Sequence, residues 1–189
     1  MTYSGFLRFT GLCGMVSGVL ILSLSVWYNA SMEEIGSFVD LAGMLLLPIA
    51  LIGIYLINMR NFGKLGFGVF LLTFLGAIMW AGHSWVNAFV VPVLEAAAPG
   101  VLEEVPPLLM TGVSLSLYPF FVGLLLFGLF LALKGILPKG AGIILVLVPI
   151  LDFVPYGSFL AQPLAGLSFI WLGYTIWSER YSGALKARQ

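Results

Sequence analysis

Long apolar runs dominate this chain of 189 residues and restrict the folds that it can adopt. A helix needs about 20 apolar residues to cross a bilayer, and hydrophobic residues make up 61% of the sequence. The runs are continuous and rich in leucine, without the alternation of a membrane β-barrel, so helices are the structure that satisfies their backbone hydrogen bonds in lipid. We therefore predict one all-α domain over residues 1–189, a polytopic transmembrane bundle. Its six spans are expected at about 9–28, 38–58, 65–85, 113–133, 140–156 and 159–177.

The charged residues divide between the two sides of such a bundle. All eight Lys and Arg residues fall outside the runs, in segments that six spans would place on one side. Because Lys and Arg collect on the cytoplasmic side of a membrane, we expect both termini in the cytoplasm, the N-in/C-in topology. The basic residues are Arg8, Arg60, Lys64, Lys134, Lys139, Arg180, Lys186 and Arg188, and the acidic residues of the outer connections are Glu33, Glu34, Glu95, Glu103 and Glu104.

The longest segment between runs, 92–112, is predicted to be an external loop. It contains four prolines and three glutamates together with apolar clusters. Loops longer than about 12–15 residues often act as lids or binding loops. The segment is therefore expected to be either a cap over the bundle or a tether that joins two distant helices.

Small residues in the first run favour close helix contacts. Gly14 and Gly18 form a GxxxG pair, which lets two helix backbones approach closely in lipid. The pair predicts either packing within one bundle or a homodimer or larger membrane complex. The lipid bilayer is the other expected partner, and the net charge of zero gives no reason to expect a nucleic acid.

Three ionisable residues lie inside the runs: Asp40, His83 and Asp152. Charge is costly in lipid, so such residues suggest a function, and all three fall toward the outer side. Asp152 is the strongest candidate because Pro149 and Pro155 flank it, and carbonyl groups freed by proline can help to form a cavity. The alternative is that these groups only make interhelical hydrogen bonds and reach the interface by snorkelling.

Other polar side chains join this outer group. Trp80, His83 and Asn87 follow steps of three and four residues and so share one helix face, while Gln162 lies about one turn into the last run. We expect an outward-facing polar pocket. Its candidate ligand-binding residues are Asp40, Trp80, His83, Asn87, Tyr118, Asp152, Tyr156 and Gln162.

Several chemistries remain open for this pocket. No metalloprotease, nucleophile-elbow or phosphate-loop motif is present, so no catalytic residue is assigned, and Asp40, His83 and Asp152 are only candidates. The same three groups form a possible divalent-metal set. A carboxylate beside His83 would instead give a proton-linked switch. The sequence predicts no cofactor.

Short motifs that are spread along most of the chain carry one resemblance. They are Gly53-Ile-Tyr-Leu, Gly63-Lys-Leu-Gly, Trp80-Ala-Gly-His, Val91-Pro-Val-Leu, Leu137-Pro-Lys-Gly-Ala-Gly and Trp171-Leu-Gly-Tyr. With these motifs the chain resembles a group of small polytopic membrane proteins of Gram-positive bacteria that have no known activity. The resemblance implies a bacterial plasma membrane and supplies neither an activity nor site residues.

The functional prediction that follows most directly is a non-enzymatic membrane protein. It would be an accessory subunit, or a small-solute or lipid-binding protein open to the outer leaflet. One alternative is a proton-coupled small-solute transporter that uses Asp40, His83 and Asp152, although the apolar cytoplasmic half counts against passage through the bundle. The other is an intramembrane enzyme, with or without a metal, that uses the same residues.

Overall fold

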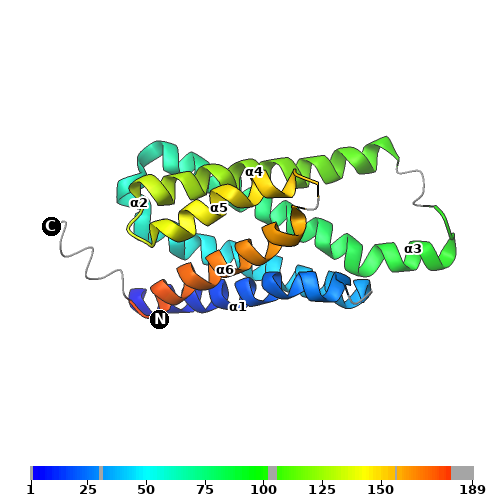
Figure 1. Cartoon of the computed structure of the whole chain (residues 1–189), viewed down its shortest axis with the longest axis horizontal. Helices are drawn as coiled ribbons and strands as arrows, with labels where there is room; N and C mark the ends of the chain where they lie inside the picture. The colour runs from blue at the N-terminus through cyan, green and yellow to red at the C-terminus, as the bar shows by residue number, and fades with distance from the viewer. Residues whose placement is uncertain (1, 30–31, 102–105, 156, 180–189) are drawn as a thin grey trace.

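The fold is known from a computed structural model that describes residues 2–29, 32–101, 106–155 and 157–179. Within these residues all regular structure is helical, and the helices lie along the axis of one elongated bundle (Figure 1). This confirms the all-α prediction. The elements are α1 (Tyr3–Asn29), α2 (Glu33–Trp85), the π-helical turn η1 (Val86–Val90), α3 (Val91–Ala97), α4 (Pro107–Lys134), α5 (Lys139–Asp152) and α6 (Ser158–Trp177).

Helix α2 is a hairpin of two arms, 33–62 and 64–85. Gly63 separates them with φ 61° and ψ −161°, a backbone conformation that is essentially restricted to glycine. The rings of Tyr55 and Phe70 stack across the hairpin with centroids 4.4 Å apart. The second and third apolar runs are therefore antiparallel neighbours.

The second arm of α2 extends farther than the sequence suggested. It continues through η1 and α3 to Ala97, and α4 already begins at Pro107. Pro92 is the second residue of α3 and directly follows the π-helical turn η1, where the regular hydrogen-bond ladder of the helix is already interrupted. The predicted external loop 92–112 is thus helical at both ends, and residues 102–105 lie outside the described residues.

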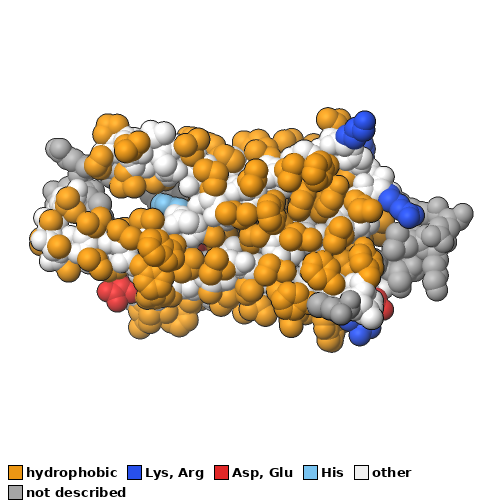
Figure 2. All heavy atoms as spheres, turned by 180° about the vertical axis from the view of Figure 1, so that it is seen from behind, with side chains coloured by type: hydrophobic (Ala, Val, Ile, Leu, Met, Phe, Trp, Pro, Cys, Tyr) orange, Lys and Arg blue, Asp and Glu red, His pale blue; other side chains and the backbone are white. Residues whose placement is uncertain are grey.

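Four helical stretches in the described residues are long and apolar enough to cross a membrane: Tyr3–Trp27, Glu33–Ala97, Pro107–Lys134 and Phe159–Trp177. The second stretch contains the Gly63 bend, so it passes along the bundle twice. Helix α5 has only 14 residues. Apolar side chains cover the bundle along its length in Figure 2. These features suggest a membrane protein.

Small residues bring α1 and α6 into close contact. A Cβ atom added to Gly18 would lie 2.6 Å from the carbonyl oxygen of Gly166, and one added to Gly173 would lie 2.5 Å from that of Gly11. Gly14 also packs against Gly173. Both glycines of the GxxxG pair therefore pack against α6 within the bundle. The predicted homodimer or larger complex stays a prediction.

One end of the bundle is held together by polar contacts. Arg8 pairs with Glu179 at 3.0 Å, which joins the start of α1 to the end of α6. Asn58 accepts a 2.7 Å hydrogen bond from the N–H group of Ile136, and it is fully buried. We call this end of the bundle the basic end, because Lys and Arg side chains gather there (Figure 2). It holds the Gly63 bend, the α4–α5 connection, the start of α1 and the end of α6 (Figure 1).

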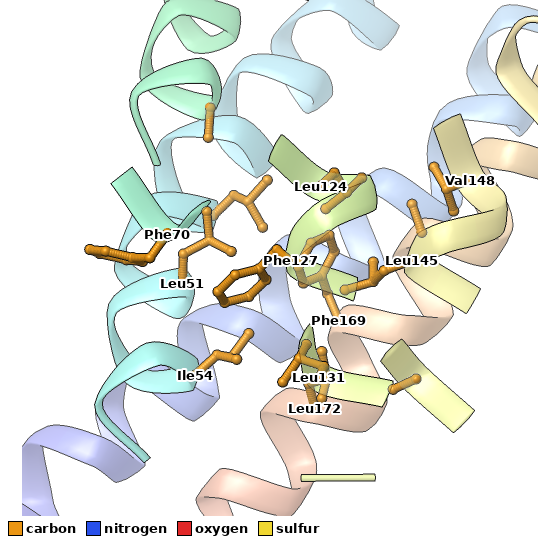
Figure 3. Close-up of a cluster of buried hydrophobic side chains, with 14 of the residues drawn as sticks. Leu51, Ile54, Phe70, Leu124, Phe127, Leu131, Leu145, Val148, Phe169 and Leu172 are labelled. Atoms are coloured by element: carbon orange, nitrogen blue, oxygen red, sulfur yellow. The ribbon is translucent and has the colours of Figure 1, made fainter. Parts of the chain in front are cut away.

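A cluster of buried apolar side chains forms the core of the bundle, and part of it is drawn in Figure 3. Phe127, Leu131 and Leu145 have essentially no exposed surface. Packing of this density leaves few voids as large as a water molecule. The part of the cluster that Figure 3 labels is Leu51, Ile54, Phe70, Leu124, Phe127, Leu131, Leu145, Val148, Phe169 and Leu172.

Candidate functional site

A cavity of about 140 Å³ lies among α1, both arms of α2, α4, α5 and α6. Leu124, Val148 and Phe169 border it and also belong to the apolar cluster. Nine of the 14 lining residues belong to this cluster, so the cavity lies within it. Asp152, the last residue of α5, places the cavity toward the end opposite the basic one. Its lining consists of Ile21, Leu24, Asp40, Met44, Trp80, Phe120, Phe121, Leu124, Val148, Asp152, Ala161, Gln162, Ala165 and Phe169.

The α2 hairpin contributes one polar wall. The hydroxyl group of the buried Ser84 donates a hydrogen bond to Oδ2 of Asp40 at 2.5 Å, and it also lies 3.0 Å from the carbonyl oxygen of Trp80. Because a serine hydroxyl carries one proton, the carboxylate and the carbonyl compete for it. The arms of α2 are thus joined at the level of the cavity.

Trp80 forms an aromatic wall beside this carboxylate. Its ring centroid lies 5.6 Å from those of both Phe120 and Phe121. The indole N–H group is buried, and it makes no hydrogen bond of normal geometry within the described residues.

Helices α5 and α6 contribute the opposite polar wall. Asp152 is the last residue of α5 and Gln162 lies in the first turns of α6. Both side chains are half-buried, and neither makes a hydrogen bond or ion pair with another residue in the described part of the chain. Because buried polar groups are normally satisfied, these two side chains remain available to water or a ligand.

Prolines lie beside the lining residues of three helices. Pro119 precedes Phe120 in α4, Pro149 follows Val148 in α5, and Pro163 follows Gln162 in α6. Each proline removes one backbone hydrogen bond and disturbs the helix around it. We attribute the looser packing around the cavity to these residues.

The structure brings together four of the eight predicted binding residues. Asp40, Trp80, Asp152 and Gln162 line the cavity, as the outer polar group suggested. His83 does not: its Nε2 atom lies 3.2 Å from the amide nitrogen of Asn87, and both side chains stand outside the lining.

The other two predicted positions do not add to the site. Tyr118 is 56% exposed and stacks on Phe153 outside the cavity, and Tyr156 lies outside the described residues. No three His, Cys, Asp or Glu side chains in the described residues could hold one metal ion. Asp40, His83 and Asp152 are therefore not assembled as the metal set that the sequence suggested.

Sequence reasoning missed the apolar lining of the cavity. Phe120, Phe121 and Phe169 look like ordinary core residues because nothing in their spacing separates a cavity wall from a packed helix face. Two prolines could have indicated the cavity: Pro119 beside Phe120 and Pro163 beside Gln162. Each proline marks a helix that cannot pack regularly.

Comparisons with protein-family models, with curated proteins and with solved structures find no match to this chain. The resemblance to small membrane proteins of Gram-positive bacteria therefore stays a prediction, and the site must be interpreted from its own residues.

Proposed function

We propose that this chain is a bacterial plasma-membrane protein that binds a small solute in an outward-open cavity. The observation that carries the proposal is the pair of side chains, Asp152 and Gln162, that have no hydrogen-bond or ion-pair partner among the described residues and line a cavity with mostly apolar walls. A few placed polar groups in an apolar concavity are typical of small-molecule sites. The protein would act by binding, as a receptor or accessory subunit.

The orientation in this proposal rests on charge. Six spans and cytoplasmic termini would place the basic end in the cytoplasm, in accord with the positive-inside rule. The cavity would then face the cell exterior. Helix α5, at about 21 Å for its 14 residues, would be the fifth of the six spans. Its short length would be offset by its burial against α4 and α6.

The alternatives have less support. A proton-coupled transporter needs access from both sides, and the side chains that follow Leu124 along α4 toward the basic end, Phe127 and Leu131, are apolar and fully buried. An intramembrane enzyme that uses Asp40, His83 and Asp152 would need all three groups at one place, and His83 stands outside the cavity lining.

Cysteine accessibility tests the proposal without knowledge of the solute. The single native cysteine, Cys13, is buried, so a Cys13→Ser background carrying Gln162→Cys offers one thiol at the cavity. We expect a small, charged, membrane-impermeant thiosulfonate to modify it when the reagent is applied from outside intact cells.

The matched control is Leu145→Cys in the same background, because Leu145 has no exposed surface and lies in the apolar cluster. Its thiol should stay unmodified in the folded protein and react after denaturation. If the Gln162→Cys thiol reacts only from the cytoplasmic side, or from neither side, the proposed outward-open binding site is wrong.

A further inference from the structure

The charge of the cavity identifies the class of solute it would hold. Two carboxyl groups, Asp40 and Asp152, line it, and none of its lining residues is basic. The Asp40 carboxyl group has a hydroxyl donor in Ser84, whereas Asp152 makes no hydrogen bond or ion pair with any described residue. Carboxylates inside a membrane bundle normally pair with an opposite charge, and the described residues that line this cavity provide none.

The aromatic residues point to the same class. Trp80 lines the cavity together with Phe120, Phe121 and Phe169. Aromatic faces attract cations, and tryptophan does so most strongly, which is how proteins recognise quaternary ammonium groups. An organic cation would thus meet ring faces and carboxylates in one space, whereas a metal ion would require more closely grouped oxygen ligands.

The volume sets an upper limit on size. An apolar cavity of about 150 Å³ accommodates benzene, and this cavity measures about 140 Å³. A molecule or head group of about six to eight heavy atoms is therefore the largest that fits without rearrangement of the helices. The Gln162 amide could bind one hydroxyl or similar polar group on the same molecule.

We propose that the cavity binds a small organic ammonium group. Asp40 and Asp152 would be its counter-charges, and the cation would lie against the ring face of Trp80. This inference rests on the proposed solute-binding function and names its ligand class. The ammonium group would belong either to a free amine or to the head group of an outer-leaflet lipid, and both present the same chemistry to the site.

The test compares choline with 3,3-dimethylbutan-1-ol, a neutral molecule of the same shape. Isothermal titration is carried out on the full chain in nanodiscs of phosphatidylglycerol. Because the two ligands differ only in charge, we expect choline to bind about tenfold more tightly or better. Equal or tighter binding of the neutral molecule would overturn the ammonium assignment and leave a solute site in place.

Two variants test whether the preference for choline depends on a carboxylate in the cavity. Asp152→Asn keeps the size of the side chain and should abolish most of the preference for choline. Glu95→Gln removes a carboxylate from an exposed position on α3, outside the cavity lining, and should leave the preference unchanged. Choline binding that survives Asp152→Asn unchanged, in a variant that melts like the parent protein, would also overturn the assignment.

A second set of nanodiscs distinguishes the two sources of the ammonium group. Phosphatidylethanolamine is added to the bilayer and the choline titration is repeated. Weaker apparent choline binding would support a lipid head group as the natural occupant, since the lipid competes for the site. Unchanged binding would support a free amine. Failure of the Gln162→Cys accessibility test, in contrast, would remove the site itself.

Discussion

Ser84 on the second arm of α2 donates a hydrogen bond to the carboxyl group of Asp40 on the first arm. The contact spans 44 positions of sequence and lies at the border of the cavity. A buried carboxylate without a donor is costly. The bond therefore has two consequences, since it joins the arms of the hairpin and holds one of the two acidic groups in place.

A double-mutant cycle on this pair measures the bond. Ser84→Ala should lower the free energy of unfolding by about 1–3 kcal/mol because it removes the hydroxyl donor from a buried carboxyl group. Asp40→Ala should cost less, since the Ser84 hydroxyl keeps the Trp80 carbonyl as an acceptor. The coupling should be about 0.5–3 kcal/mol, measured by unfolding in mixed detergent micelles. Ser37→Ala, at a local and exposed bond, is the control, and additive effects in the cycle would contradict the prediction.

Asn58 should be the most sensitive polar residue at the basic end. It accepts a bond from the Ile136 N–H group and donates one to the Ile54 carbonyl, both at 2.7 Å. Asn58→Ala leaves a buried backbone donor unsatisfied, which costs about 1–3 kcal/mol. Asn61→Ala removes an exposed bond to the Lys134 carbonyl and should cost clearly less. Similar melting temperatures for the two variants would show that the burial of Asn58 does not increase its contribution to stability, and would contradict the prediction.

Gly166 controls the contact between α1 and α6. A Cβ atom there would lie 2.5 Å from the Gly18 carbonyl oxygen, so Gly166→Ala forces two backbones apart. Overpacking of this kind costs about 1–3 kcal/mol. Gly82→Ala is the matched control because nothing lies within 4 Å of a Cβ atom at that position. Thermal unfolding in detergent should show a lower midpoint for Gly166→Ala and an unchanged or higher one for Gly82→Ala.

Topology can be tested at two exposed positions in a Cys13→Ser background. An impermeant maleimide should label Glu33→Cys in intact cells, because the start of α2 would face outward. Lys64→Cys, beside the Gly63 bend, should be labelled only after the cells are permeabilised. The reverse pattern would invert the proposed orientation and place the cavity on the cytoplasmic side.

Some properties of this chain can be predicted from the linear order of its residues. The length and apolarity of the runs predicted an all-helical bundle, and the grouping of Lys and Arg predicted which connections share an end. Asp40, Asp152, Gln162 and Trp80 were recognised as one outer group because depth along a helix depends only on distance from its ends. The extension of α2 to Ala97 was not foreseen, since a proline at a helix start and a proline that ends a helix look alike.

What the sequence determined by itself is therefore the class of fold, the segregation of charge and the depth of the polar residues. Only the tertiary structure decided which side chains meet. Helix rotation depends on close contacts between neighbouring helices, such as Gly18 with Gly166 between α1 and α6. In the packed bundle Asp152 lines the cavity and His83 does not. The bounds of an apolar run determine where its helix begins and ends, and therefore the depth of each residue in the bundle. Packing against a neighbouring helix determines which way each side chain faces.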